Sequence, residues 1–297
     1  MENWQLRQKQ SLPLEVKIEM SKRKIREWLE HWDNECYVSF SGGKDSTVLL
    51  DLVRQVDKNI PAVFSNTGLE YPEIVSFVRS FENIEIVKPK FKFKDVLDKH
   101  GYPVISKISA RCINDLQNPT DKNVATRHAR LTGFNKNGVH SPASMLAKKW
   151  LYLVDAPFKI SDRCCEELKK KPFREYGKRT GKKPFNGTMA SDSQQRARGY
   201  LKSGCNMFDA KMPISKPLSF WMEQDIWDYI KKYKLPYSKI YDMGATRTGC
   251  FACMFGVHLE KGENRFQRMK KNHPKHYKYC IEKLEIGKVL DFIGVTY

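Results

Sequence analysis

The residues that most clearly predict chemistry form one short run, Ser41-Gly42-Gly43-Lys44-Asp45-Ser46. The run lies between an apolar segment typical of a strand and one typical of a helix, where phosphate-binding loops occur. Its two glycines allow a sharp turn, so that successive N–H groups can point at one anion. The helix N-terminus, the Lys44 ammonium and the serine hydroxyls would add positive charge and further donors. Because the kinase-type loop requires Gly-x-x-x-x-Gly-Lys-Ser/Thr, we predict a phosphate-binding loop of another type.

Cysteines form the second group with chemical potential. A vicinal pair, Cys164-Cys165, is followed well downstream by Cys250-Phe251-Ala252-Cys253. Four thiolates from two loops can close a tetrahedral site for zinc or for an iron–sulfur cluster, and the spacing alone favours zinc. Clustered cysteines of a reducing compartment bind metal more often than they form disulfides. The remaining four are expected to be buried thiols: Cys36, Cys112, Cys205 and Cys280.

Alternating apolar segments predict the elements that position these groups. Residues 14–33 have helical spacing, and strands are expected at 36–40, 61–65, 84–87 and 184–190. Helices are expected between them, at 47–53, 71–81 and 93–100, and then at 192–202, 220–233 and 261–285, the last interrupted at Pro274. This order predicts an α/β fold, an open and mostly parallel sheet with helices on both faces. A helical insertion and a mainly helical C-terminal part complete it.

Three consecutive segments are predicted. An N-terminal amphipathic helix occupies residues 1–35, and an α/β nucleotide-binding domain occupies 36–218 with a basic insertion at about 102–160. A helical C-terminal region with the Cys-x-x-Cys loop occupies 219–297. The chain has no run of about 18 apolar residues and no apolar stretch of a signal peptide at its start, which predicts a cytoplasmic protein without a membrane partner.

Four separated motifs, spanning roughly residues 36–256, resemble those of a known family. The first loop resembles the loop of the ATP pyrophosphatase superfamily (PP-loop, adenine nucleotide alpha hydrolase-like). Within it, residues 65–73, 185–193 and 217–227 resemble the PAPS/APS reductase-like branch, and Arg196 and Arg198 follow the third motif. In character the chain is most similar to the ATP pyrophosphatase component of DNA phosphorothioation systems. The branch often has Arg and Glu in its third motif, where this chain has Met189 and Asp192.

The resemblance implies a nucleotide site with a catalytic core. The catalytic residues are expected to be Lys44, Asp45 and Ser46, with Mg²⁺ on the departing pyrophosphate. The residues expected to bind ATP are Ser39, Phe40, Ser41, Gly42, Gly43, Lys44, Asp45, Ser46, Asn66, Thr67, Gly68, Glu70, Gly187, Ser193 and Arg196. The resemblance also changes the order of the metal hypotheses, because it implies a 4Fe-4S cluster on Cys164, Cys165, Cys250 and Cys253.

Charge bears on the choice of substrate. The chain has 53 Lys and Arg against 34 Asp and Glu, a net charge of +19, which favours an anionic partner. Residues 169–183 contain eight Lys or Arg and one Glu. A polyanion requires such a surface, whereas a small sulfonucleotide needs only a few cations. Phe173 and Tyr176 are expected to stack on the bases of a single strand.

The leading hypothesis is an ATP pyrophosphatase that adenylates nucleic acid, with DNA favoured, for sulfur insertion. A cysteine desulfurase is the expected sulfur donor. One alternative is APS/PAPS reduction to sulfite with thioredoxin, and another is tRNA thiolation. The stretch around Cys280 does not match the Glu-Cys-Gly motif that carries the reductases' attacking cysteine, which counts against reduction. A module that senses nucleotides or nucleic acid without turnover is the non-enzymatic alternative.

Overall fold

A computed structural model describes all 297 residues, and these divide into two compact units. The first unit comprises residues 1–66, 70–88 and 172–248, and the second comprises 67–69, 89–171 and 249–297. Each unit is therefore assembled from separate stretches of chain, unlike the three consecutive segments predicted from the sequence. The predicted insertion at 102–160 belongs wholly to the second unit. The structure contains no helix that is both long enough and apolar enough to cross a membrane.

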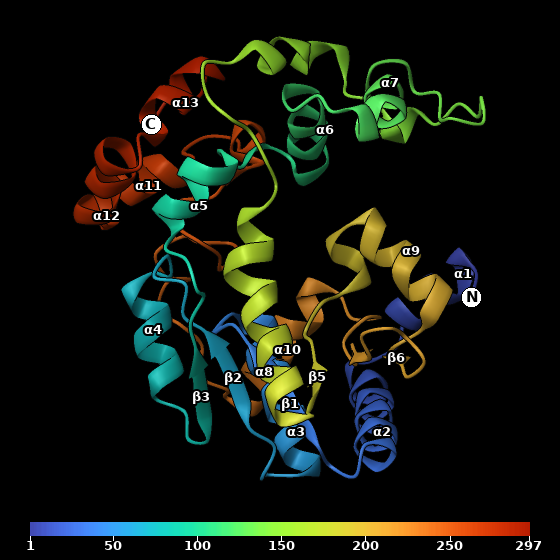
Figure 1. Ribbon diagram of the computed structural model, residues 1–297. Coiled ribbons are helices and arrows are strands. Elements are labelled where there is room, and N and C mark those ends of the chain that lie inside the picture. The colour runs from blue at the N-terminus through green and yellow to red at the C-terminus, as the bar shows by residue number, and fades with distance from the viewer. The chain divides into compact units, whose positions relative to one another are not determined.

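A six-stranded sheet organises the first unit (Figure 1). Its order is β3-β2-β1-β5-β7-β6, and every pairing is parallel except that of the edge strand β6 with β7. The strands are β1 (Cys36–Phe40), β2 (Ala62–Ser65), β3 (Ile84–Val87), β5 (Lys183–Phe185), β6 (Asn206–Met207) and β7 (Ile214–Ser215). This sheet confirms the predicted fold class. Parallel order places the carboxyl ends of β1 and β5 at one edge, because Val38 pairs with both Ala62 and Phe185.

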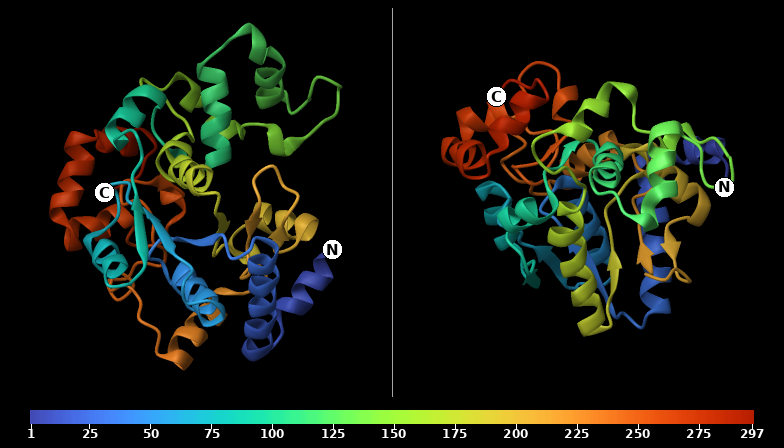
Figure 2. Two further views of the ribbon diagram at one scale, coloured as in Figure 1. Left: turned by 60° about the horizontal axis from the view of Figure 1, so that its bottom comes forward. Right: turned by 45° about the horizontal axis from the view of Figure 1, so that its top comes forward.

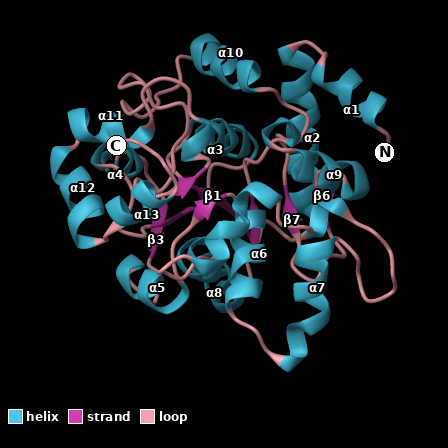
Figure 3. Cartoon of the chain, turned by 90° about the horizontal axis from the view of Figure 1, so that it is seen from above, coloured by secondary structure: helices cyan, strands magenta, loops and turns pink.

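Helices cover both faces of this sheet, as the view along it shows (Figure 3). Helices α2 (Leu14–His31), α3 (Lys44–Val56) and α10 (Glu223–Tyr233) pack on one another over one face. Helix α8 (Lys171–Thr180) lies on the other face (Figure 2). There the Tyr176 ring packs against Tyr37. Because side chains of a strand alternate between faces, Val38 joins the main core while its neighbour Tyr37 joins the core under α8. Both faces are buried, as expected for a parallel sheet.

The remaining elements of the first unit complete this arrangement. They are α1 (Asn3–Gln10), α4 (Pro72–Arg79), a 3₁₀ turn (Ala190–Asp192) and α9 (Gln194–Ser203). The strand predicted at 184–190 ends at Phe185. The chain leaves the sheet there because the Asn186 side chain accepts a hydrogen bond from the N–H of Thr188, a local turn that competes with strand pairing.

Substitution of Phe185 tests how much the central strand β5 contributes to stability. Its side chain is fully buried, with the Trp28 ring 6.3 Å away. Phe185→Ala is expected to lower the free energy of unfolding by about 3–5 kcal/mol, because it leaves a cavity that the surrounding rings cannot fill. Denaturant titration measures the change, with the exposed Met212→Ala as control. A loss below about 1 kcal/mol would show that β5 is not part of the core.

The second unit is mainly helical. Its helices are α5 (Phe93–His100), α6 (Lys107–Gln117), α7 (Val124–Thr132), α11 (Arg265–Asn272), α12 (Pro274–Lys278) and α13 (Ile286–Phe292). Strands β4 (Val104–Ile105) and β8 (Met254–Phe255) form a small parallel pair. Shorter helical turns occupy Asp121–Asn123, Pro142–Ser144, Lys148–Asp155, Glu166–Lys170, Val257–Leu259 and Tyr279–Lys283. The expected break at Pro274 is confirmed, since α11 ends at Asn272 and α12 begins at Pro274.

Candidate functional site: a phosphate loop and a four-cysteine group

The predicted phosphate loop connects β1, which contains Ser39 and Phe40, to the first turn of α3. Ser46 holds the loop in shape. Its hydroxyl donates to the carbonyl of Gly43 at 2.9 Å and accepts from the N–H of Ser41 at 3.2 Å. The Ser41 hydroxyl lies 3.0 Å from the same oxygen. The two serines therefore act first as internal braces of the loop, a role that their spacing alone did not reveal.

Both glycines of the loop are required by their surroundings. Gly42 has φ of +71°, which favours glycine, and a Cβ there would lie 2.8 Å from a methyl group of Val78. A Cβ on Gly43 would lie 2.3 Å from Thr248 Oγ1. Gly187, from the third motif, approaches the loop from β5, since a Cβ there would lie 3.1 Å from the Asp45 carbonyl oxygen. The loop is thus closely packed by three later segments: α4, the third motif and the segment around Thr248.

Lys44 is buried at the start of α3, with its side chain only 5% exposed. Its Nζ lies 3.0 Å from Glu223 Oε1 and 3.6 Å from Asp45 Oδ1. The same ammonium lies over the rings of Trp227 and Tyr241, 5.9 Å and 5.5 Å from their centroids. Burial opposes the charge on Lys44, but Asp45, Tyr241 and Glu223 together raise its pKa. Lys44 is therefore a permanent cation beside the loop.

Asp45, the residue after Lys44, has a carboxylate oxygen without a hydrogen-bond donor. Its Oδ1 atom is buried and accepts no hydrogen bond. Burial is the main reason that the pKa of Asp45 is raised, and Asp192 and Glu223 raise it further, while Lys44 opposes them. A buried carboxylate oxygen without a donor is suited to a cation, and oxygen is the ligand that Mg²⁺ prefers. The residues present therefore fit the Mg²⁺ that the resemblance implies.

The third motif supplies side chains at the start of α9. Ser193 caps this helix by accepting from the N–H of Arg196 at 3.3 Å. Arg196 is exposed and forms an ion pair with Asp192, whose carboxylate also accepts from the N–H of Met189 at 3.1 Å. Met189 is buried in the core. Of this motif, Gly187 is the residue that the structure brings against the phosphate loop.

The second motif is shared between the units. Asn66 and Glu70 belong to the first unit, whereas Thr67 and Gly68 belong to the second. The Asn66 N–H extends the sheet by donating to the carbonyl of Val87 at 2.9 Å. Within the second unit, the carbonyl of Leu69 accepts from the N–H of Phe251 at 2.8 Å. The structure thereby joins the second motif directly to the Cys-x-x-Cys loop.

All four predicted cysteine ligands lie in the second unit. Cys164 and Cys165 share a hydrogen bond, which raises the pKa of Cys164 and lowers that of Cys165. Cys250 and Cys253 are near enough to raise the pKa of Cys164 further. Lys107 and Lys169 favour the Cys165 thiolate. The four thiols thus share one electrostatic neighbourhood beside two cations.

No group of three or more His, Cys, Asp or Glu side chains in the structure is already arranged to hold a metal ion. The chemistry of the donor set still fits the implied cluster, since thiolates are the ligands of iron–sulfur clusters and the neighbouring lysines offset negative charge. Cys36 and Cys280 are fully buried, and burial raises the pKa of each thiol to about 12. They agree with the prediction that they are packed thiols.

The family follows from a comparison of the whole chain. A family model described as the phosphoadenosine phosphosulfate reductase domain matches residues 35–104 and 119–255, which include the phosphate loop and all four cysteines. The chain belongs to the phosphoadenosine phosphosulfate reductase domain family. This result confirms the predicted membership of the broader superfamily branch.

Individual members of the family are distant. An uncharacterized protein of Methanocaldococcus jannaschii is 24% identical over 271 residues, covering 88% of this chain and 51% of the relative. The adenosine 5'-phosphosulfate reductase of Anoxybacillus flavithermus is 24% identical over 264 residues, covering 88% and 90%. The chain therefore spans about half the length of the first relative and most of the second.

Two solved structures show a more remote likeness. The phosphoadenylyl-sulfate reductase of Candida auris, solved as a phosphate complex, has a TM-score of 0.45 at 16% identity, covering 81% of this chain and 96% of that one. The U34-tRNA thiolase of Methanococcus maripaludis, solved with its 4Fe-4S cluster, has a TM-score of 0.39 at 20% identity, covering 91% and 79%.

Sequence reasoning missed three residues around the phosphate loop of this family member. Glu223 pairs with Lys44, and Tyr241 and Thr248 approach the loop from the segment after α10. Glu223 lies within the motif at 217–227, and that motif gives no sign of an ion pair with Lys44. Thr248 lies two residues before Cys250, where the cysteines are the stronger signal. Nothing in local spacing indicates that Tyr241 returns to the start of α3.

The prediction that Phe173 and Tyr176 stack on nucleic-acid bases is wrong. Tyr176 is 1% exposed, and its hydroxyl donates to Glu85 Oε1 at 2.6 Å. Phe173 stacks on Tyr37, with ring centroids 6.4 Å apart. Their spacing on α8 points both rings toward the sheet, so they stabilise the fold instead of meeting a ligand.

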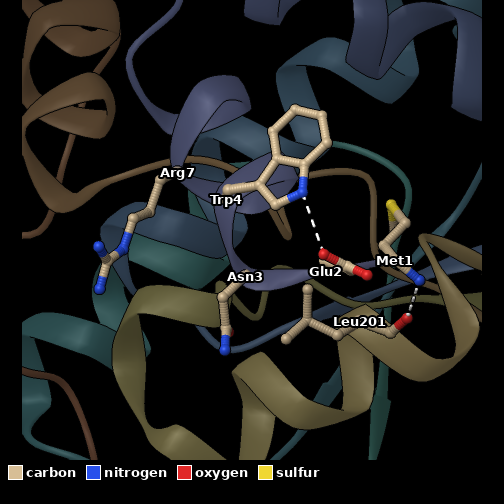
Figure 4. Close-up of a pocket in the computed structure, with 6 residues that line it drawn as sticks. All are labelled: Met1, Glu2, Asn3, Trp4, Arg7 and Leu201. Atoms are coloured by element: carbon tan, nitrogen blue, oxygen red, sulfur yellow. Dashed lines mark hydrogen bonds between the residues drawn. The ribbon is translucent and has the colours of Figure 1, made fainter.

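A surface pocket of about 550 Å³ lies elsewhere in the first unit, between α1 and α9 (Figure 4). Trp4 donates to Glu2 at 3.1 Å, and the Met1 ammonium donates to the carbonyl of Leu201 at 2.9 Å. None of the predicted site residues lines this pocket. The contacts instead explain how the first helix is held against α9.

Proposed function

We propose that this member of the phosphoadenosine phosphosulfate reductase family is an ATP pyrophosphatase that adenylates a nucleic-acid acceptor, with DNA favoured, for sulfur insertion. The observation that carries the proposal is the phosphate loop with a buried Lys44 ammonium and a buried Asp45 Oδ1 that accepts no hydrogen bond and has the Lys44 ammonium 3.6 Å away. A buried ammonium beside backbone N–H groups can stabilise a polyphosphate, because negative charge builds up on the departing pyrophosphate as its bond to the α-phosphorus breaks. Sulfur would come from a cysteine desulfurase.

The proposed reaction has two steps, adenylation of the acceptor and displacement of AMP by sulfur. An acceptor oxygen attacks the α-phosphorus of ATP, and the bond to the bridging oxygen breaks so that pyrophosphate leaves with both electrons. The terminal sulfur of the desulfurase persulfide then attacks the activated centre of the acceptor and displaces AMP, and an external thiol reductant cleaves the remaining S–S bond with two electrons. In this scheme Lys44 and the loop amides stabilise the developing charge, and Ser41 and Ser46 hold the loop in its binding shape. Asp45 would hold Mg²⁺, which when bound neutralises charge on the pyrophosphate.

The four cysteines would hold the 4Fe-4S cluster. Such a cluster supplies either electrons or a coordination position for sulfur. Lys107 and Lys169, beside Cys165, would lower the cost of its negative charge. The bond between Leu69 and Phe251 gives this group a structural connection to the second nucleotide motif.

Sulfonucleotide reduction with thioredoxin is the second candidate. It is favoured by relatives named adenosine 5'-phosphosulfate reductase, at 23–24% identity. Cys280 does not serve as the attacking thiol of that reaction, because it is fully buried and its pKa is raised to about 12. Because this observation counts against reduction, we give that activity as the second candidate.

Pyrophosphate release distinguishes the two. Purified protein is incubated with ATP, Mg²⁺ and single-stranded DNA, duplex DNA or tRNA, and pyrophosphate and AMP are measured. We expect release that depends on a nucleic acid. Sulfite formed from adenosine 5'-phosphosulfate with thioredoxin, without pyrophosphate from ATP, would overturn the proposal in favour of reduction.

The surface for nucleic acid is proposed to lie on the predicted basic insertion, around α7. No residue of α7 is buried, and Lys122, Arg127 and Lys136 have no carboxylate partner. The adjoining hairpin exposes Phe134, whose ring packs on His140. By contrast, several lysines of the 169–183 stretch are already paired: Lys170 with Glu166, Lys171 with Glu167 and Lys182 with Glu35. The unpaired cations around α7 therefore offer the better phosphate contacts.

Neutralising Lys122, Arg127 and Lys136 together to glutamine is expected to weaken DNA binding by about tenfold or more at low salt. The slope of log affinity against log salt should fall by about 2–3, because each phosphate contact releases about one counterion. Fluorescence anisotropy at several salt concentrations measures both. The control carries the same charge change on the first unit, at Lys58, Lys202 and Lys211. Equal losses in the two variants would mean that only net charge matters.

A further inference from the structure

Tyr241 occupies an unexpected position over the start of α3 in the first unit. Its phenol oxygen accepts a hydrogen bond from the backbone N–H of Lys44 at 2.9 Å. The Thr248 hydroxyl lies beside the same phenol, since a Cβ built on Gly43 would lie 2.3 Å from Thr248 Oγ1 and 3.4 Å from the Tyr241 hydroxyl, and it lowers the pKa of Tyr241. A backbone amide and a hydroxyl from distant parts of the chain are therefore both near one oxygen atom beside the phosphate loop.

The donors are of the kind that binds a phosphate oxygen. The Lys44 N–H belongs to the first turn of a 13-residue helix, where amides lack a carbonyl partner within the helix. The Lys44 ammonium stands on the face of the Tyr241 ring. Burial raises the pKa of Tyr241, so the oxygen now held there is that of a neutral phenol. A charged oxygen would form stronger, charge-assisted hydrogen bonds with the same donors.

The Thr248 hydroxyl can approach the loop only because residue 43 is a glycine. A Cβ at Gly43 would lie 2.3 Å from Thr248 Oγ1 and 3.4 Å from the Tyr241 hydroxyl. A larger residue at position 43 would therefore displace Thr248 even if no phosphate were bound. The second glycine of the loop thus makes room for the Thr248 hydroxyl as well as for an anion.

We propose that Thr248 is a phosphate-binding residue and that Tyr241 is the internal occupant of its oxygen site. A phosphate oxygen of the nucleotide takes over the Lys44 N–H and the Thr248 hydroxyl, and the phenol oxygen leaves them. This inference rests on the proposed phosphate-binding role of the loop, but not on the identity of the acceptor. No covalent step is involved.

The pairing of Lys44 permits this exchange. Its partner Glu223 is 64% exposed, so water competes for that carboxylate and weakens the ion pair. Arrival of a phosphate can therefore redirect the ammonium without a large cost. The Tyr241 ring also has another support, because it meets the Trp227 ring edge-on at 5.4 Å. Losing the hydroxyl contacts need not release the whole segment.

Pyrophosphate titration by calorimetry tests the proposal on the full chain. Tyr241→Phe keeps the ring but removes the competing oxygen, so the Kd for pyrophosphate should fall by about 3–10-fold. Thr248→Val removes one donor and should raise the Kd by about 3–10-fold, whereas Thr248→Ser, which keeps a hydroxyl, should restore it. Melting temperatures within a few degrees of the parent would show that the variants are folded.

The outcomes separate the possibilities. Weaker binding by Tyr241→Phe would overturn the proposal, because the hydroxyl would then itself bind phosphate. Unchanged binding by Thr248→Val, or no binding by the parent and Tyr241→Phe alike, would also overturn it. Pyrophosphate release from ATP is measured separately. Binding that follows the expected order without any turnover would support the oxygen site and contradict the proposed function, and turnover with the opposite binding order would do the reverse.

Discussion

Lys44→Ala is expected to reduce pyrophosphate release from ATP by about 10²–10³-fold or more. The Lys44 ammonium is buried, stays charged, and stands beside the amides that would hold the phosphates. Removing it leaves the increasing negative charge of the departing pyrophosphate without its main protein cation. Because the interaction strengthens as the bond breaks, the loss should appear mainly in kcat.

Two variants act as controls for this result. Lys58→Ala removes an equal charge from the exposed surface of the same unit and should leave turnover unchanged. Asp45→Asn keeps the shape of the side chain but weakens a carboxylate that fits Mg²⁺, so its defect should shrink as the Mg²⁺ concentration rises. Lys44→Ala protein that releases pyrophosphate at the rate of the parent would remove the phosphate loop from the mechanism.

The second large effect is expected at the cysteines. Cys165→Ser and Cys250→Ser should each lose most of the bound iron and the broad visible absorbance of anaerobically purified protein, because one thiolate of four is missing. Cys112→Ala is the matched control, since this buried thiol of the same unit has only the Ser144 carbonyl as partner. Iron and acid-labile sulfide assays measure the content.

Metal analysis of the parent protein decides whether the four cysteines bind a 4Fe-4S cluster or zinc. Iron and sulfide in equal amounts, about four of each per chain, would support the 4Fe-4S cluster. A colourless protein with one zinc per chain would contradict it and favour the site that cysteine spacing alone predicts. Retention of full iron content in Cys165→Ser would show that Cys165 is not a ligand.

Local patterns predicted most of the first unit. The helix predicted at 14–33 is α2, and the strands predicted at 36–40 and 84–87 have the predicted bounds. These elements carry their own signals, because an apolar stripe at helical spacing or a short apolar run between turns must be buried somewhere. The turn at residues 41–46 was also predicted, since glycines between a strand and a helix indicate a turn without any distant partner.

Short strands escaped prediction for a physical reason. Strands β4, β6, β7 and β8 have two residues each, too few for any alternation of side chains to be visible in the sequence. They exist because neighbouring backbone supplies their hydrogen bonds, as β5 does for β7. The rings of Phe173 and Tyr176 were misjudged for a related reason. Aromatic residues among lysines resemble a stacking surface until the sheet beneath them is known.

The sequence by itself determined that this chain has an α/β fold, and it selected the loop at residues 41–46 and the four cysteines as the candidate phosphate and metal sites. These features depend on residue types at fixed local spacing. Only the tertiary structure decided that the Tyr241 hydroxyl accepts from the Lys44 amide with Thr248 beside it, that Glu223 pairs with the Lys44 ammonium, and that Leu69 is joined to the Cys-x-x-Cys loop. Such contacts join residues far apart in the chain, and they arise from how packed elements return on one another, which no local pattern records.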